Sequence, residues 1–253
     1  MQNKLYGLIG FPLSHSFSKK YFTEKFEKEK ILGCEFNLFP IEKIEMFPEL
    51  INENHTLLGL SVTIPYKESV IPFLDELDET AKAVGAVNCV RISRKESSIH
   101  LKGFNTDVFG FRQSIKPFLE SQHERALILG TGGASKAVFH VLKEIGIECY
   151  FASRQKKQNA SDKTFLYEEL NENMMNAFKL IVNTSPLGMF PHTESAPQIP
   201  YDFISSSHLL YDLVYNPTET EFLKRGKAKG ASTVNGLSML YQQAEEAWRI
   251  WNK

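Results

Sequence analysis

The feature that most constrains the fold is a glycine-rich turn between a strand pattern and a helix pattern. The apolar run 125–130 (RALILG) leads into Gly132 and Gly133, and an amphipathic stretch over 132–146 begins at once. Glycines at such a turn let the backbone approach a pyrophosphate, and a helix N-terminus offers free N–H groups and a positive dipole end. A turn without a ligand is the alternative, but the flanking strand and helix favour a dinucleotide site. The residues expected to form it are Gly130, Thr131, Gly132, Gly133 and Ala134.

The next strand pattern, 148–154 (ECYFASR), indicates which dinucleotide is bound. NAD-binding proteins usually place an acid at the end of this strand, where it accepts from the ribose hydroxyls. Here the strand ends in Ser153 and Arg154, and Lys156 and Lys157 follow. A carboxylate would repel a 2′-phosphate, whereas a guanidinium binds it through two hydrogen bonds. A solvated basic loop is the alternative, but at this position the sequence favours NADP.

The remaining pattern predicts an α/β protein. Short apolar runs alternate with amphipathic stretches, which is typical of parallel sheets covered by helices. Strands are expected at 4–10, 34–40, 57–63, 87–93, 98–105, 125–130, 148–154, 178–184 and 208–215. Helices are expected at 16–30, 41–53, near 66–77, and at 106–119, 132–146 and 237–251. A domain boundary is expected near residue 106.

Composition excludes several classes of function. The 253 residues are 42% hydrophobic and 23% charged, and the formal net charge is −1, so nothing in the bulk charge attracts nucleic acid. The cysteines, Cys34, Cys89 and Cys149, show no metal-ligand spacing and are interpreted as reduced thiols, so no metal is expected. We find neither a leader peptide nor a membrane-spanning run. A cytoplasmic protein without a membrane partner is the expectation.

Seven separated segments resemble one family, shikimate dehydrogenase, and they occur in that family's order. They are GFPLSHSFSK (10–19), LSVTIPYK (60–67), AVNCV (86–90) with GFNTD (103–107), LGTGGASKAV (129–138), NTSPLGM (183–189) and NGLSMLYQQA (235–244). The resemblance implies NADP-dependent, reversible reduction of 3-dehydroshikimate to shikimate in aromatic amino acid biosynthesis. It also implies a substrate domain at 1–106 and 235–253, completed by the last helix, and a Rossmann-like NADP domain at 107–234.

The resemblance assigns roles to individual residues. Lys67 and Asp107 would be catalytic, because an ammonium can protonate the alkoxide formed on reduction and a carboxylate can complete the relay. Without the resemblance, Lys67 is better interpreted as an exposed lysine at a helix start and Asp107 as a helix N-cap. Polar ligands of the substrate would be Ser14, Ser16, Thr63, Asn88, Tyr215 and Gln243. Met189 and Gly236 would border the nicotinamide.

Three departures from the expected patterns are visible. Ser135 stands where the common dinucleotide fingerprint has a third glycine, so the helix and strand are expected to pack differently there. Lys19 and Lys20 follow Ser18, where the family often has a proline. The strand tip has Ser153 and Arg154 followed by glutamine, where an Asn-Arg-Thr triplet is usual. The arginine remains, so NADP is still expected.

Two other functions stay open at this point. One is a quinate or quinate/shikimate dehydrogenase using NAD, which would share Lys67 and Asp107. The other is a non-catalytic dinucleotide sensor on the same fold, against which the presence of both residues argues. The expected assembly is a monomer or a homodimer, with a small molecule as the only partner.

Overall fold

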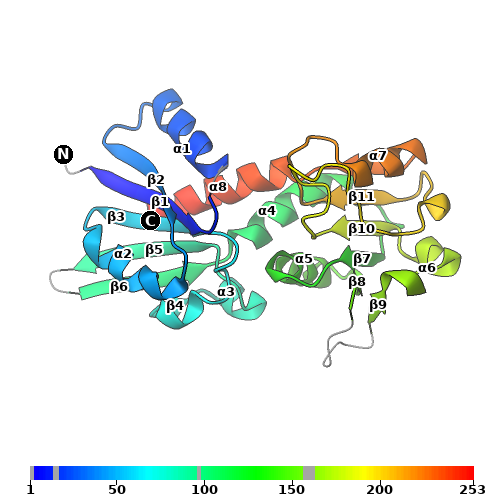
Figure 1. The fold of residues 1–253 in the computed structure, drawn as a ribbon, viewed down its shortest axis with the longest axis horizontal. Coiled ribbons are helices and arrows are strands. Elements are labelled where there is room, and N and C mark those ends of the chain that lie inside the picture. Colours follow the sequence, from blue (N-terminus) through cyan, green and yellow to red (C-terminus); the bar gives the residue numbers. More distant parts are fainter. Residues whose placement is uncertain (1–2, 14–16, 96–97, 156–162) are drawn as a thin grey trace. The chain divides into compact units, whose positions relative to one another are not determined.

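The chain forms two compact units, each with its own sheet. A computed structural model describes residues 3–13, 17–95, 98–155 and 163–253. Unit 1 comprises residues 1–106 and 244–253, and unit 2 comprises residues 107–243. The divisions fall within two helices, α4 (Thr106–Ile115) and α8 (Leu237–Trp251), both visible in Figure 1.

Unit 1 contains a mixed six-stranded sheet with the order β2-β1-β3-β5-β6-β4. Its strands are β1 (Lys4–Gly10), β2 (Cys34–Pro40), β3 (Leu57–Val62), β4 (Glu76–Leu77), β5 (Cys89–Lys95) and β6 (Ser98–Phe104). Strand β1 pairs in parallel with β2 and β3, whereas β5 is antiparallel to both β3 and β6. The sheet of this α/β unit is therefore mixed, and only part of it is parallel as the alternating pattern suggested. Only two residues separate β5 from β6, which is too short for a parallel crossover.

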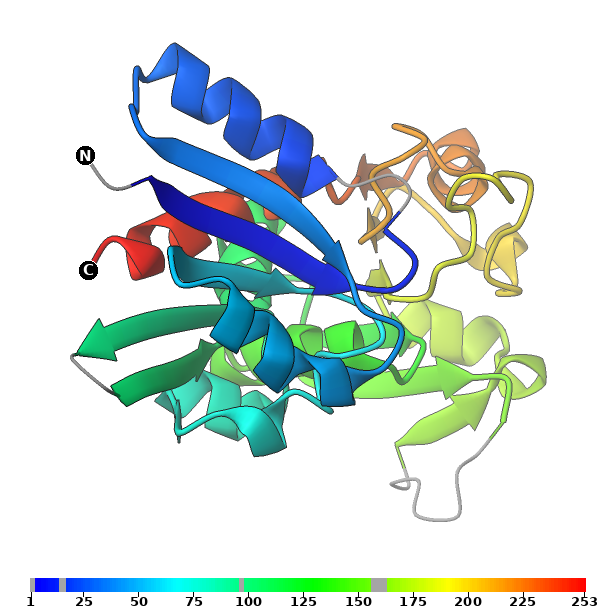
Figure 2. The same ribbon diagram turned by 60° about the vertical axis from the view of Figure 1, so that its left-hand side comes forward.

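Helices cover both faces of this sheet (Figure 2). Side chains alternate along β1, so that Tyr6 and Leu8 face one cluster of core residues and Ile9 faces the other. The first cluster includes Phe22 from α1 (Phe17–Lys28) and Trp251 from α8. The second includes residues of α2 (Phe47–Glu53). The part of the last helix from Ala244 onward therefore belongs to the core of unit 1, whereas its first residues belong to unit 2.

Trp251 is the residue that fixes α8 to the sheet of unit 1. Its indole Nε1 donates to the Val90 carbonyl at 3.1 Å, and its ring stacks on Tyr6 with centroids 5.2 Å apart. A Cβ on Gly59 would lie 2.3 Å from Trp251 Cδ1, so only glycine leaves room for the indole.

We expect Trp251→Ala to lower the free energy of unfolding by about 3–5 kcal/mol, because it empties a buried aromatic position. Denaturant unfolding followed by circular dichroism measures the change. Arg249→Ala, on the exposed side of the same helix, is the control and should change stability by less than about 0.5 kcal/mol. Equal effects of the two variants would contradict this account of α8.

Unit 2 is a parallel sheet with the doubly wound strand order. The order is β12-β11-β10-β7-β8-β9, and every pair is parallel. Its strands are β7 (Arg125–Leu129), β8 (Glu148–Ser153), β9 (Thr164–Leu166), β10 (Leu180–Asn183), β11 (Leu209–Asp212) and β12 (Ser232–Val234). Numbered along the unit, this is the order 3-2-1-4-5-6 of dinucleotide-binding folds, in which ligands bind at the carboxyl ends of the strands. The helices are α4, α5 (Gly133–Glu144), α6 (Glu172–Ala177), α7 (Glu221–Ala228) and the start of α8.

Most predicted elements are confirmed, but the helix expected near 66–77 is wrong. That segment consists of turns, a short 3-10 helix at Ile71–Phe73 and strand β4. Pro72 explains the failure, since it removes a backbone donor and restricts the residue before it. Pro48, in contrast, is compatible with a helix, because it lies in the first turn of α2, where proline is tolerated. Periodicity did not predict α3 (Glu79–Val84), β9, α6, α7 and β12, which are all eight residues or shorter.

Candidate functional site

The glycine-rich turn has the backbone geometry of a phosphate-binding loop. Gly130 follows β7 with φ at +106°, a conformation that favours glycine, and its N–H donates to the Ala152 carbonyl at 2.8 Å. Helix α5 starts at Gly133 with Gly132 at its N-cap, and no side chain caps it. A Cβ at Gly132 would meet nothing within 4 Å, so the helix N-terminus opens onto free space. An uncapped helix end with this exposure is suited to an anion.

Ser135 fits the position where a third glycine is common. Its side chain is buried, and its hydroxyl donates to the Gly132 carbonyl at 2.5 Å. The Ser135 N–H donates to the same carbonyl at 3.1 Å. These two hydrogen bonds stabilise the turn from the first turn of the helix. The side chain of Ser135, which is larger than that of a glycine, is therefore accommodated at this position.

The tip of β8 lies beside this turn, because β7 and β8 pair in parallel and Leu129 is opposite Ala152. Ser153 is buried, and its hydroxyl donates to the Gln155 carbonyl at 2.6 Å, so the serine shapes the tip. Arg154 is exposed at the end of the strand. Burial raises the pKa of Tyr167, and the nearby Arg154 guanidinium acts against that shift. Lys156 and Lys157 lie outside the described residues.

The predicted nicotinamide residues Met189 and Gly236 lie in the segments that follow β10 and β12. Met189 is 46% exposed on the loop that follows β10. Gly236 is packed so tightly against the segment that follows β11 that a Cβ would lie 2.1 Å from the Leu213 carbonyl oxygen. Its N–H donates to the Val214 carbonyl at 3.2 Å. Tyr215 directly follows Val214 in the segment after β11. It is half-buried, and burial raises its pKa.

A buried hydrogen-bond network joins these loops, and sequence reasoning missed it. The carboxylate of Asp212 accepts from Asn183 Nδ2 at 2.9 Å and from Thr220 Oγ1 at 2.6 Å. All three residues are fully buried. The only signal in the sequence was an acid that ends an otherwise apolar strand (LLYD), because such a residue needs nearby donors.

We expect the burial of Asp212 to make stability fall as pH rises. Burial raises the pKa of Asp212 from 3.8 to about 6. Because the pKa of Asp212 is higher in the folded state than in the unfolded state, its contribution to the free energy of unfolding is fully present below the unfolded pKa of 3.8. That contribution is lost as pH rises through the folded pKa of about 6. The difference of about two pKa units corresponds to roughly 3 kcal/mol.

Urea unfolding of wild type and Asp212→Asn from about pH 4 to pH 7 tests this, because the variant lacks the titration. The free energy of wild type relative to the variant should decline over that range. Asp202→Asn is the control with the opposite sign, since Lys229 lowers the pKa of Asp202. A pH-independent difference between wild type and Asp212→Asn would contradict the prediction.

In unit 1, three predicted residues gather at the carboxyl end of β3. Thr63 follows that strand directly, and its N–H donates to the Ile9 carbonyl at 3.0 Å. The Val62 N–H donates to the Asn88 carbonyl at 2.8 Å, and the Val87 N–H donates to the Lys67 carbonyl at 2.7 Å. The backbones of Thr63, Lys67 and Asn88 are thus held together by hydrogen bonds. Ser14 and Ser16 lie outside the described residues.

Neither simpler interpretation of the proposed catalytic pair fits the structure. Lys67 is half-buried in a turn, not exposed at a helix start. Asp107 is the second residue of α4, so it lies inside the first turn and not at the N-cap. Asp107 is also buried, with 3% of its surface exposed. The first N–H of α4, that of Thr106, instead donates to the side chain of Asn88, with an N–Oδ1 distance of 2.6 Å.

Gln243 packs on the same face of α4 as Asp107. A Cβ on Gly110 would lie 2.6 Å from Gln243 Cγ and 2.6 Å from the Met239 carbonyl, so α4 and α8 cross closely at this glycine. Asp107 lies one turn before Gly110 on that helix. Within unit 2, Gln243 therefore contacts α4 about one turn after Asp107.

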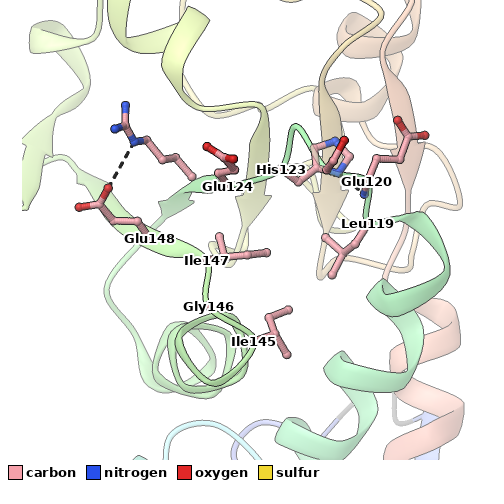
Figure 3. Close-up of a pocket in the computed structure, with 10 residues that line it drawn as sticks. Leu119, Glu120, His123, Glu124, Ile145, Gly146, Ile147 and Glu148 are labelled. Atoms are coloured by element: carbon pink, nitrogen blue, oxygen red, sulfur yellow. Dashed lines mark hydrogen bonds and ion pairs between the residues drawn. The ribbon is translucent and has the colours of Figure 1, made fainter.

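A hollow of about 570 Å³ lies at the opposite, amino-terminal edge of β7 and β8 (Figure 3). Glu120, Glu124 and Glu148 are among its lining residues, and Glu148 pairs with Arg125 at 3.3 Å. Its acidic lining does not suit a pyrophosphate, and the carboxyl edge of the sheet remains the candidate site.

Neither a metal centre nor a membrane span emerges from the described part of the chain. Over those residues, no group of three or more His, Cys, Asp or Glu side chains could hold a metal ion. No helix there combines the length and apolar character needed to cross a membrane. Cys34, Cys89 and Cys149 are free thiols, and burial raises the pKa of each.

The fold and the site together define an α/β protein with a doubly wound dinucleotide-binding unit. The family model for the shikimate dehydrogenase substrate binding domain matches residues 8–90. The shikimate dehydrogenase (NADP(+)) of Carboxydothermus hydrogenoformans is 39% identical, over 99% of this chain and 92% of the relative. The chain belongs to the shikimate dehydrogenase family.

Solved structures agree with this membership. Shikimate dehydrogenase from Aquifex aeolicus is 33% identical and superposes with a TM-score of 0.86, over 99% of this chain and 92% of that one. The Thermus thermophilus shikimate 5-dehydrogenase, solved in complex with NADP(H) and shikimate, is 30% identical with a TM-score of 0.84. That alignment covers 98% of this chain and 93% of the Thermus chain.

Proposed function

We propose that this protein is an NADP-dependent dehydrogenase that interconverts 3-dehydroshikimate and shikimate. The observation that carries the proposal is the tip of β8 in a chain of this family. Arg154 stands there in place of an acid, beside the uncapped N-terminus of α5. This arrangement suits a dinucleotide with a 2′-phosphate and disfavours one with a free ribose.

The residues present fit NADP on physical grounds. The turn at 130–134 would hold the pyrophosphate, because the space beside Gly132 is open and the uncapped start of α5 offers free N–H groups. Ser153 and Arg154 would hold the 2′-phosphate, while Met189 and Gly236 would border the nicotinamide. When bound, NADP(H) supplies or accepts the hydride at the carbon that bears the reacting oxygen.

Lys67 and Asp107 are proposed to handle the proton. In the direction of ketone reduction, the Lys67 ammonium donates a hydrogen bond to the substrate oxygen and then a proton, so that no free alkoxide forms. Asp107 accepts a hydrogen bond from the neighbouring hydroxyl and orients the ring. In the reverse direction Lys67 removes the hydroxyl proton.

The other polar residues are proposed to orient the substrate. Ser14 and Ser16 would donate to its carboxylate. The hydroxyls and amides of Thr63, Asn88, Tyr215 and Gln243 would bind its ring substituents and carboxylate. Neutral donors at several positions fix one orientation of a small polar ring, which is what hydride transfer requires.

We also propose the assignment of the domains and the setting of the enzyme. Residues 1–106 and 235–253 form the substrate domain, and residues 107–234 form the NADP domain. The protein acts in the cytoplasm as a monomer or a homodimer.

The test is a two-by-two assay of the purified protein with shikimate or quinate and with NADP or NAD, followed at the nicotinamide absorbance band. The proposal predicts the highest kcat/KM for shikimate with NADP. A higher kcat/KM for quinate with NAD would favour the alternative enzyme. Cofactor binding without turnover of any pair would favour a dinucleotide sensor.

A further inference from the structure

We propose that Asp212 is a positioning residue, which holds the loops 184–190 and 213–217 in the geometry needed for hydride transfer. Asp212 touches neither substrate nor cofactor in this proposal; it acts through Met189, Tyr215 and Gly236. The inference rests on the proposed function, which places those three residues at the nicotinamide and the substrate.

The first step of the argument is the environment of the carboxylate. Asp212 ends β11 with none of its surface exposed. Its Oδ1 accepts from Asn183 Nδ2 at 2.9 Å and from the Val214 N–H at 3.0 Å. Its Oδ2 accepts from Thr220 Oγ1 at 2.6 Å. Both oxygens are thus occupied by donors, and each donor comes from a different segment of unit 2.

The second step follows the bonds into the loop that carries Met189. Asn183 Oδ1 accepts from the Ser185 N–H at 3.1 Å and from Ser185 Oγ at 2.7 Å. Asn183 Nδ2 also points to the Leu187 carbonyl, at 3.4 Å. Because Asn183 Nδ2 donates to Asp212, the amide is held with Oδ1 facing Ser185, where it accepts the hydrogen bonds of the loop. Met189 follows Leu187 by two residues.

The third step follows the bonds toward Tyr215 and Gly236. The Val214 N–H is held by Asp212, and the Val214 carbonyl accepts from the Gly236 N–H at 3.2 Å. Tyr215 is the next residue along the chain. The Phe190 N–H donates to the Asn216 carbonyl at 3.2 Å, which ties the two loops to each other. Met189, Tyr215 and Gly236 are therefore all connected to the Asp212 carboxylate through the hydrogen bonds of neighbouring residues.

The fourth step explains why a carboxylate is needed and an amide would not serve. All three partners donate, and a carboxylate accepts on both oxygens. In Asp212→Asn one oxygen becomes an NH2 group, which would face a donor and leave a buried hydrogen bond unmade. The shape of the side chain is retained, so the loops lose a partner without gaining a cavity.

The experiment compares Asp212→Asn with a matched pair at Thr220. Thr220→Val removes the hydroxyl that donates to Asp212, whereas Thr220→Ser keeps it. Thr220 also caps α7 through the Leu223 N–H, so Asn171→Ala, which removes the cap of α6 in the same unit, controls for cap loss. The measurements are kcat, KM for NADP, and hydrogen exchange of the Ser185, Phe190 and Gly236 amides without cofactor.

For Asp212→Asn and Thr220→Val we expect kcat to fall roughly 10- to 100-fold, the size of effect that misplacement of a reacting group produces. KM for NADP should stay within about threefold, because the phosphates are bound elsewhere. Exchange should rise at the three loop amides in these two variants. Thr220→Ser and Asn171→Ala should resemble wild type in both kinetics and loop exchange.

The proposal would be overturned if the loop amides of Asp212→Asn exchanged at the wild-type rate. It would also be overturned if exchange rose throughout unit 2 while kcat stayed unchanged. The amide measurement needs no turnover. An inactive wild type would therefore refute the proposed function, while the exchange data would still show whether Asp212 holds the loops.

Discussion

Replacing Lys67 with alanine is expected to lower kcat for shikimate oxidation by about 100- to 10,000-fold, the usual contribution of a general acid–base group. That range corresponds to roughly 3 to 5 kcal/mol of barrier. KM for shikimate should change far less, because a group that transfers a proton acts mainly in the transition state. Affinity for NADP should be retained, since the dinucleotide residues belong to unit 2.

The structure supports this prediction by fixing the lysine backbone. The Lys67 carbonyl accepts from the Val87 N–H, so the turn after β3 is tied to the segment before β5. Lys67→Arg should rescue little activity, because a guanidinium keeps its proton near neutrality. Lys82→Ala, at an exposed lysine of the same unit, is the matched control and should leave kcat unchanged. A Lys67→Ala enzyme with normal kcat and raised KM would make Lys67 a binding residue only.

The second large effect is expected at the strand tip. Arg154→Asp should lower kcat/KM for NADP by about 10- to 100-fold or more, since hydrogen bonds to charged groups contribute about 1.5–3 kcal/mol and the new carboxylate adds repulsion. The value for NAD should hold or rise, because an acid at this position can accept from the ribose hydroxyls. The preference for NADP should therefore flatten or reverse.

Kinetics with both cofactors at subsaturating concentrations measure this change. Lys116→Asp makes the same charge change at an exposed position of unit 2 and controls for bulk electrostatics. It should leave the ratio of the two kcat/KM values unaltered. A wild-type enzyme that uses both cofactors equally well would refute the role of Arg154.

Local patterns in the sequence predicted the strand and helix on either side of the glycine-rich turn. The run before Gly130 and the amphipathic stretch after it needed only periodicity and glycine conformation, and both elements formed as expected. The tip of β8 could also be located, because its position follows from the parallel pairing of neighbouring strands. What periodicity could not show is that the Ser153 hydroxyl donates to its own loop.

Contacts between distant segments were beyond sequence reasoning. Asp212 and its partner Asn183 are 29 residues apart, and nothing in the spacing of the two indicates a hydrogen bond. The close crossing at Gly110 depends in the same way on a helix more than a hundred residues later. The failed helix near 66–77 has a local cause, since Pro72 interrupts the helical hydrogen bonding of that segment.

The final helix shows how a resemblance and packing complement each other. Its periodicity predicted a helix over 237–251 without indicating which unit it joins. The structure divides the helix between the two units, and its C-terminal end packs in unit 1, because the Trp251 indole lies against Gly59 and donates to the Val90 carbonyl of the first sheet.

The central claim, that this enzyme transfers hydride between shikimate and NADP, is tested most directly by isotope transfer. Shikimate deuterated at the carbon that bears the oxidised hydroxyl would be incubated with the protein and NADP, and the reduced cofactor would be isolated and analysed by mass spectrometry. The account predicts that the deuterium is recovered in the nicotinamide ring, with 3-dehydroshikimate formed in equal amount. Reduced cofactor without deuterium, or no reduced cofactor at all, would contradict it.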